Sequence, residues 1–234
     1  MSATYTASHR RLEIASIATF LIGSGILAGR LLRYSGGAGW LIAAAIFLGL
    51  IAADFVSGFV HWMADTWGSV ETPFFGEALV RPFREHHTDQ LAITRHDFIE
   101  TNGNNSLVSL PVLGAAFCIP LDHASGLFAA ALLWSLVLWV FGTNQFHKWA
   151  HQKERPVLVR WLQRVHLILP PDHHALHHRT PFLQHYCITT GWLNVPLAAT
   201  KFFRALEFVV HKSTGMVPRE DDLATVAKAN RRAA

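Results

Sequence analysis

The sequence predicts an all-α fold: an integral membrane bundle of about four transmembrane helices with a histidine-rich di-metal site on its cytoplasmic side. Three observations lead to this prediction. Apolar residues make up 51% of the 234 residues and charged residues only 15%, whereas about 25% of residues in soluble domains are charged. Long apolar stretches recur along the chain. The chain also contains 15 histidines, most of them between His61 and His178.

Four stretches approach the roughly 20 apolar residues that a helix needs to cross a bilayer, namely residues 12–29, 40–61, 107–121 and 124–146. The third contains Pro111 and Pro120, so we expect it to be tilted, broken or re-entrant. We interpret the first as a membrane anchor and not as a cleavable signal peptide, because Arg30 and Arg33 follow it directly. No polar linker interrupts the chain, which predicts one domain over residues 1–234.

Charge patterning predicts the orientation of these helices. With four spans, the N-terminus, residues 63–106 and the chain after His147 lie on one side, and their arginines and lysines place that side in the cytoplasm. Arg30 and Arg33 on the other side oppose this assignment. The formal charge of +4 is scattered between apolar spans, which favours a membrane surface over nucleic acid as the partner. The compact length and the lack of a C-terminal dilysine signal favour a bacterial inner membrane over endoplasmic reticulum.

The second span ends in a polar stripe. Asp54, Gly58, His61 and Asp65 follow helical spacing and therefore lie along one face. A carboxylate within an apolar span is energetically costly and indicates a functional residue, or alternatively a structural hydrogen bond to a neighbouring helix.

Three further segments supply histidines. His86 and His87 are adjacent, so on a helix they point about 100° apart and can serve two metals; a surface pair is the alternative. His147 and His151 form an i,i+4 pair at the end of the fourth span, with Asn144 one turn earlier on the same face. Such a pair alone is a weak signal.

The strongest signal follows Pro170 and Pro171, which suit the entry to a helix. Four histidines there make two overlapping i,i+4 pairs. With the earlier segments the candidate metal ligands are His61, His86, His87, His96, His147, His151, His173, His174, His177 and His178. One zinc ion takes only four ligands, so two metals fit this supply. Imidazole suits zinc, copper, iron and nickel; the lipid setting favours iron, because iron with oxygen can attack a C–H bond.

Long motifs in this chain closely resemble the plasmanylethanolamine desaturase family of Kua-type lipid desaturases. The resemblance covers about residues 53–222, and the first span is matched only in character. The motifs are ADFVSGFVHWMADTWGSVE at 53–71, RPFREHHTDQLAITRHDFIETNGNN at 81–105, NQFHKWAH at 144–151, HLILPPDHHALHH at 166–178 and CITTGWLN at 187–194.

The resemblance implies an enzyme with two iron ions and O2 as co-substrate, which converts the alkyl ether of an ether phospholipid into the vinyl ether of a plasmalogen. A plant branch that desaturates an acyl chain near its carboxyl end provides the alternative. The resemblance implies ligand roles for nine of the ten candidates, with His173 and Asp65 as further candidates. We also expect Asp65 and Asn144 to act as catalytic residues. His185 stands where the family has another residue, which argues against ligation there.

Electrons must come from a separate protein, because the chain has no flavin, nicotinamide or iron–sulfur fingerprint. We expect a b-type cytochrome or a ferredoxin-like donor. Basic residues beside the site could dock such an acidic carrier or contact phospholipid headgroups; they are Arg81, Arg84, Lys148, Lys153 and Arg155. The rival functions are a membrane zinc hydrolase, disfavoured by the lack of HExxH, and a non-enzymatic membrane protein that binds metal or haem.

Overall fold

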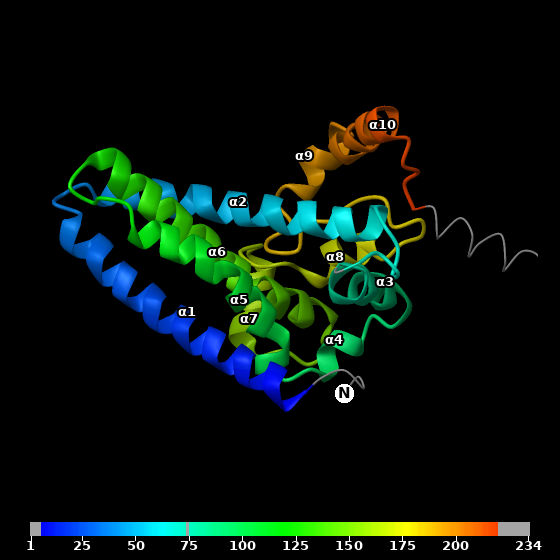
Figure 1. The fold of residues 1–234 in the computed structure, drawn as a ribbon, viewed down its shortest axis with the longest axis horizontal. Coiled ribbons are helices and arrows are strands. Elements are labelled where there is room, and N and C mark those ends of the chain that lie inside the picture. Colours follow the sequence, from blue (N-terminus) through cyan, green and yellow to red (C-terminus); the bar gives the residue numbers. More distant parts are fainter. Residues whose placement is uncertain (1–5, 74, 220–234) are drawn as a thin grey trace, which may run out of the picture.

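A bundle of four long helices forms the body of the protein (Figure 1). The structure is a computed structural model that describes residues 6–73 and 75–219, and all regular elements in this part of the chain are helical. The bundle contains α1 (Ala7–Tyr34), α2 (Gly39–Thr66), α5 (Phe98–Phe117) and α6 (Ala124–His151). α1 packs on α5, α2 packs on α6, and α5 packs on α6. The predicted all-α fold is therefore confirmed.

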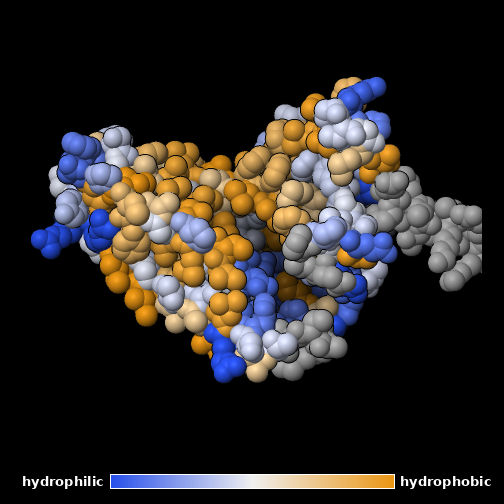
Figure 2. Space-filling model, in the orientation of Figure 1, coloured by the Kyte–Doolittle hydropathy of each residue, from blue (hydrophilic) through white to orange (hydrophobic). Residues whose placement is uncertain are grey.

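Three of these helices, α1, α2 and α6, are long and apolar enough to cross a membrane. They expose large apolar side chains that water would solvate poorly; Ile22 is 65% exposed, Leu32 70% and Trp40 71%. Figure 2 shows this apolar surface over the bundle. The chain is accordingly a membrane protein whose helices face lipid.

The predicted third span differs from the observed helix. α5 begins at Phe98, where Asp97 accepts a hydrogen bond from the Glu100 amide at 3.0 Å, and it continues through Pro111 to Phe117. Pro120 lies in the link to α6. Of the three expected forms (tilted, broken or re-entrant), the broken one is absent at Pro111. α5 is held between α1 and α6, and packing on both sides stabilises a helix that proline alone would weaken.

Small residues let α2 and α6 approach closely. A Cβ atom on Gly49 would lie 2.6 Å from Cβ of Ser135, closer than real contacts allow. The Ser135 hydroxyl donates to the Ile46 carbonyl at 2.8 Å across the same interface. Such small and hydroxylated residues are typical of helix contacts within membranes.

Short helices gather at one end of the bundle, where α2 and α6 end and α5 begins (Figure 1). Because this end collects the segments that carry the histidine motifs, residues far apart in the sequence meet there. The elements are η1 (Gly76–Val80), α3 (Arg81–Thr88), α4 (Ala92–Arg95), α7 (Val157–Arg164), α8 (Pro171–His177), α9 (Asn194–Ala199) and α10 (Phe202–Thr214).

Candidate metal centre

Two groups of side chains at this end of the bundle could each hold a metal ion, and within each group the ligand atoms lie within 4.8 Å of one another. The five-histidine cluster joins α3, α6 and the segment at α8. It consists of His86, His147, His151, His174 and His178.

His174 lies at the middle of the five-histidine cluster. Its Nε2 atom is 2.9 Å from Nε2 of His147, 2.9 Å from Nε2 of His151 and 3.0 Å from Nε2 of His178. Nε2 of His86 is also 2.9 Å from Nε2 of His151. A neutral imidazole carries one N–H, so one nitrogen cannot satisfy three such neighbours by hydrogen bonding. Convergent lone pairs of this kind fit a bound cation.

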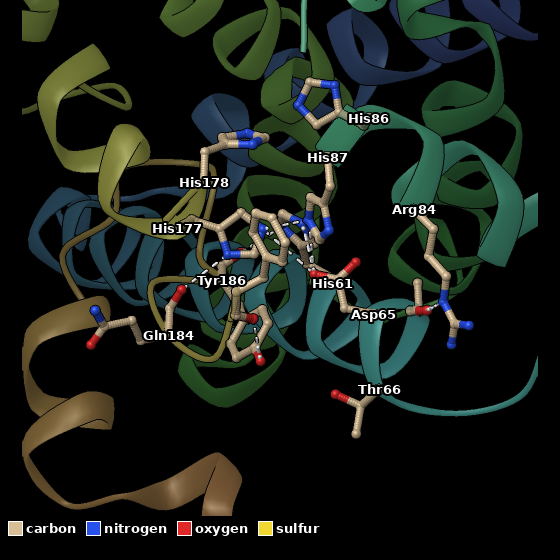
Figure 3. Close-up of polar contacts among 12 residues, drawn as sticks. His61, Asp65, Thr66, Arg84, His86, His87, His177, His178, Gln184 and Tyr186 are labelled. Atoms are coloured by element: carbon tan, nitrogen blue, oxygen red, sulfur yellow. Dashed lines mark hydrogen bonds and ion pairs between the residues drawn. The ribbon is translucent and has the colours of Figure 1, made fainter. Parts of the chain in front are cut away.

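The Asp65 cluster consists of His61, Asp65, His87 and His177 (Figure 3). Oδ2 of Asp65 lies 3.4 Å from Nε2 of His61, 3.4 Å from Nε2 of His87 and 3.5 Å from Nε2 of His177. Nε2 of His61 and both carboxylate oxygens of Asp65 are buried and make no hydrogen bond to the described residues. Buried polar atoms normally have a partner, so a metal ion fits this set of donors.

Backbone carbonyls orient two ligands of the Asp65 cluster. Nδ1 of His61 is 3.1 Å from the Tyr186 carbonyl, and Nδ1 of His177 is 3.0 Å from the Gln184 carbonyl. A carbonyl only accepts, so each Nδ1 donates and each Nε2 presents its lone pair to the site. Sequence reasoning missed this role of residues 184–186, because a backbone carbonyl leaves no signal in side-chain identity.

Burial keeps the imidazoles of His86 and His177 neutral by lowering their pKa values. Desolvation, followed by neighbouring histidines, lowers the pKa of His86 to about 3. Desolvation likewise lowers the pKa of His177 to about 4, against the opposing effect of the Asp65 charge. At neutral pH both side chains therefore carry a lone pair, which metal ligation requires.

The structure brings eight of the ten predicted histidine ligands and Asp65 into the two clusters, and leaves His96 and His173 outside both. The His96 side chain is 42% exposed and lies 3.7 Å from Glu100. His173 packs on His185, with ring centroids 5.0 Å apart. The predicted pair of His173 and His177 is separated, since His177 points into the Asp65 cluster.

Asp54 and Asn144 make structural contacts outside the two clusters. The buried Asp54 carboxylate accepts hydrogen bonds from the amides of Thr190, Gly191 and Leu193 at 2.8, 2.9 and 3.0 Å. Its contacts are therefore structural, but they are made to irregular chain before α9 and not to a neighbouring helix. The Asn144 amide donates to the Thr101 carbonyl and to Oδ1 of Asn105, both at 3.2 Å, and thereby joins α6 to α5.

Four of the five basic residues predicted to dock a carrier have partners within the protein. Nη1 of Arg81 lies 3.7 Å from Oε1 of Glu85. Arg84 donates to the Ala64 and Gly68 carbonyls at 3.3 and 3.0 Å and so caps the end of α2. Lys148 is buried and donates to the His96 carbonyl. Arg155 donates to the Gln163 side chain at 3.0 Å.

Comparisons with known proteins agree with this site. A family model described as a lipid desaturase domain matches residues 50–221, which include every residue of both clusters. The chain is 52% identical over 223 residues to plasmanylethanolamine desaturase of Myxococcus xanthus, covering 95% of this chain and 79% of that protein. It is 48% identical over 195 residues to plasmanylethanolamine desaturase 1 of Mus musculus, covering 80% of this chain and 72% of that protein.

A more distant relative is fatty acid desaturase 4, chloroplastic, of Arabidopsis thaliana, which is 34% identical over 180 residues, covering 76% of this chain and 54% of that protein. No solved structure matches the chain.

Proposed function

This chain belongs to the lipid desaturase family, and we infer its function from this membership and from the site. It is a lipid desaturase that introduces the vinyl ether double bond into an alkyl ether phospholipid, converting plasmanylethanolamine into plasmenylethanolamine. The observation that carries this conclusion is the pair of buried histidine clusters at the ends of α2 and α6, together with identities of 52% and 48% to plasmanylethanolamine desaturases.

The reaction removes one hydrogen from each of two neighbouring carbons beside the ether oxygen. O2 is the oxidant, and it is reduced to two molecules of water by the two substrate hydrogens, two further electrons and two protons. The electrons come from an external carrier, a b-type cytochrome or a ferredoxin-like protein. We place the reaction in the membrane, in a bacterial inner membrane, with the site facing the cytoplasm.

We assign two iron ions to the two clusters, one to the five-histidine cluster and one to the Asp65 cluster. Bound there, they would supply, together with O2, the oxidising power needed to break C–H bonds of the alkyl chain. The protein holds His86 and His177 neutral through burial, and it orients His61 and His177 through backbone carbonyls.

The position of the clusters suits this substrate. Both lie where long apolar helices end, and the ends of spanning helices coincide with the headgroup layer of a bilayer. The carbons next to an ether oxygen are the part of the alkyl chain closest to the headgroup. They therefore reach this depth without the lipid leaving the membrane.

A second candidate function is desaturation of an acyl chain near its carboxyl end. It is favoured by the 34% identity to a protein named fatty acid desaturase 4. Those acyl carbons lie at the same depth in a bilayer, so the site geometry accommodates either lipid.

Expression in cells that contain alkyl ether phospholipids but lack plasmalogens tests the proposal. The wild-type chain should produce acid-labile vinyl ethers, detected by mass spectrometry, and His147→Ala should produce none. An unsaturated acyl chain without vinyl ether would replace the proposed substrate by the acyl alternative. Absence of any new double bond in cells that contain the folded, iron-loaded chain would contradict both functions.

A further inference from the structure

A small cavity lies beside the Asp65 cluster, on the other side of residues 184–186. It has a volume of about 140 Å³, and its walls come from residues 183–185 and from α9 and α10. The Gln184 carbonyl faces His177 at 3.0 Å, whereas its side chain points away from the cluster (Figure 3). Gln184 also lines the cavity, so this residue contacts both the Asp65 cluster and the cavity.

The cavity presents cationic and hydrogen-bonding groups. Lys201, Arg204 and His185 line it, and no acidic residue does so among the described residues. Nε of Arg204 and Nδ1 of His185 are buried and have no hydrogen-bond partner in the described part of the chain. Unsatisfied buried nitrogens are costly, and here two of them belong to side chains that share one cavity.

Two basic side chains, Lys201 and Arg204, lie at the cavity wall. Arg204 pairs with the buried Glu207, and Nη2 of Arg219 lies 2.9 Å from Oε2 of the same carboxylate. Exposed Lys201 adds a further positive charge at the cavity wall.

The N-terminus of α10 lies at the wall of the same cavity. Lys201 is its N-cap, and the helix begins without a side-chain cap. Phe203 and Arg204 of the first turn line the cavity. The first amides of a helix have no partner within the helix and carry a partial positive charge, which favours a phosphate group.

Lipid can reach this place from the membrane. Val195 on α9 is 62% exposed, and Phe208 and Val209 on α10 are 63% and 58% exposed. Apolar side chains with such exposure place α9 and α10 against lipid. Phe203, at the cavity, contacts Tyr186, whose ring in turn contacts His177.

We propose that the cavity between residues 183–185 and α10 binds the phosphate group of the glycerophospholipid substrate, and that Lys201 and Arg204 bind this phosphate. This inference rests on the proposed function, because the substrate there is a phospholipid. Only the glycerol backbone separates the phosphate from the ether carbons. Anchoring the phosphate beside Gln184 thus places the headgroup next to the segment whose carbonyls orient His61 and His177.

Lys201→Gln removes the charge while leaving a side chain of similar length at a position whose φ is 54°, so backbone strain is unchanged. Kinetics with 1-O-alkyl-2-acyl-glycerophosphoethanolamine in mixed micelles should give a KM about tenfold higher with kcat unchanged, the effect expected for loss of one charge-assisted hydrogen bond. Lys201→Arg should restore the wild-type KM. Lys212→Gln, on the same helix but away from the cavity lining, should leave KM unaltered.

Native mass spectrometry of the detergent-purified iron-loaded chain tests the same site without turnover. The wild type should retain the phospholipid in preference to 1-O-alkyl-2-acylglycerol, which lacks phosphate, and Lys201→Gln should lose most of this preference. A chain that makes no vinyl ether but keeps this pattern would refute the proposed function and leave the phosphate site standing. Equal preference in wild type and Lys201→Gln overturns the inference. Inorganic phosphate that binds the wild type without competing with the lipid would likewise overturn the headgroup assignment.

Discussion

Nε2 of His174, on α8, lies 2.9 Å from Nε2 of His147 on α6, and both side chains are buried. This contact joins α6, four residues before its end at His151, to the short helix α8. It brings two lone pairs to one point, which is the basis of the metal assignment.

The neighbouring residues His173 and His174 provide a matched test of that assignment. We expect the wild type to hold about two irons per chain, because its two clusters provide enough ligands for two metal ions. His174→Ala should hold about one or fewer, because three contacts of the five-histidine cluster meet at His174. His173→Ala should retain the wild-type iron content, measured by elemental analysis. One zinc and no iron in the purified wild type would contradict the assignment.

Asp65→Asn tests the second metal position. The substitution keeps the shape of the side chain and removes the charge that three imidazoles surround. We expect iron affinity at the Asp65 cluster to fall at least tenfold and vinyl ether formation to fall with it, since a carboxylate is a much stronger ligand than an amide. The melting temperature of the metal-free protein should not fall, because Asp65 makes no hydrogen bond there to the described residues. Unchanged iron affinity in Asp65→Asn would remove Asp65 from the site.

Substitution of Asp54, which lies on the same helix as Asp65, should instead lower the stability of the protein. Asp54→Ala leaves the amides of Thr190, Gly191 and Leu193 without their acceptor. We expect the free energy of unfolding to fall by about 3 kcal/mol, because bonds to a buried carboxylate are strong and their loss leaves unsatisfied donors. Thermal unfolding in detergent measures this, with exposed Asp122→Ala as the control. An Asp54→Ala protein with wild-type stability and no activity would indicate a catalytic role.

The sequence could predict the site where a single helix carries the pattern. His147 and His151 share one face of α6, and His86 and His87, being adjacent on α3, point into different clusters. Helical geometry alone fixes both arrangements. The clustering of histidines and the apolar spans likewise predicted an all-α membrane bundle.

What the sequence could not predict depends on contacts between distant segments. The role of Asp54 is set by amides about 136 residues further along the chain, and nothing in the local pattern distinguishes a carboxylate that binds backbone from one that binds metal. The separation of His173 from His177 has the same origin, because His173 packs on His185 in a loop of irregular structure. The continuity of α5 through Pro111 depends on its neighbours in the bundle.

The histidine clusters should make the metal-free protein sensitive to acid. Burial lowers the pKa of His86 to about 3 and of His177 to about 4, whereas an unfolded histidine has a pKa of about 6.5. Below pH 6.5 these histidines therefore bind protons in the unfolded chain but remain neutral in the folded chain. The stability contributed by these neutral side chains is complete above about pH 6.5 and is lost as the pH falls towards 4, at about 1.4 kcal/mol per pH unit for each imidazole.

The melting temperature of chelator-treated protein should accordingly fall between pH 7 and pH 5. His86→Gln should show a shallower fall, because it removes one of the titrating groups from the clusters. Iron should shift the fall to lower pH, since a proton must then displace a metal ion from each nitrogen. A melting temperature that does not change with pH in the metal-free protein, or an equal slope in His86→Gln, would show that these imidazoles are accessible to protons in the folded state and that the clusters are not the closed sites proposed for metal.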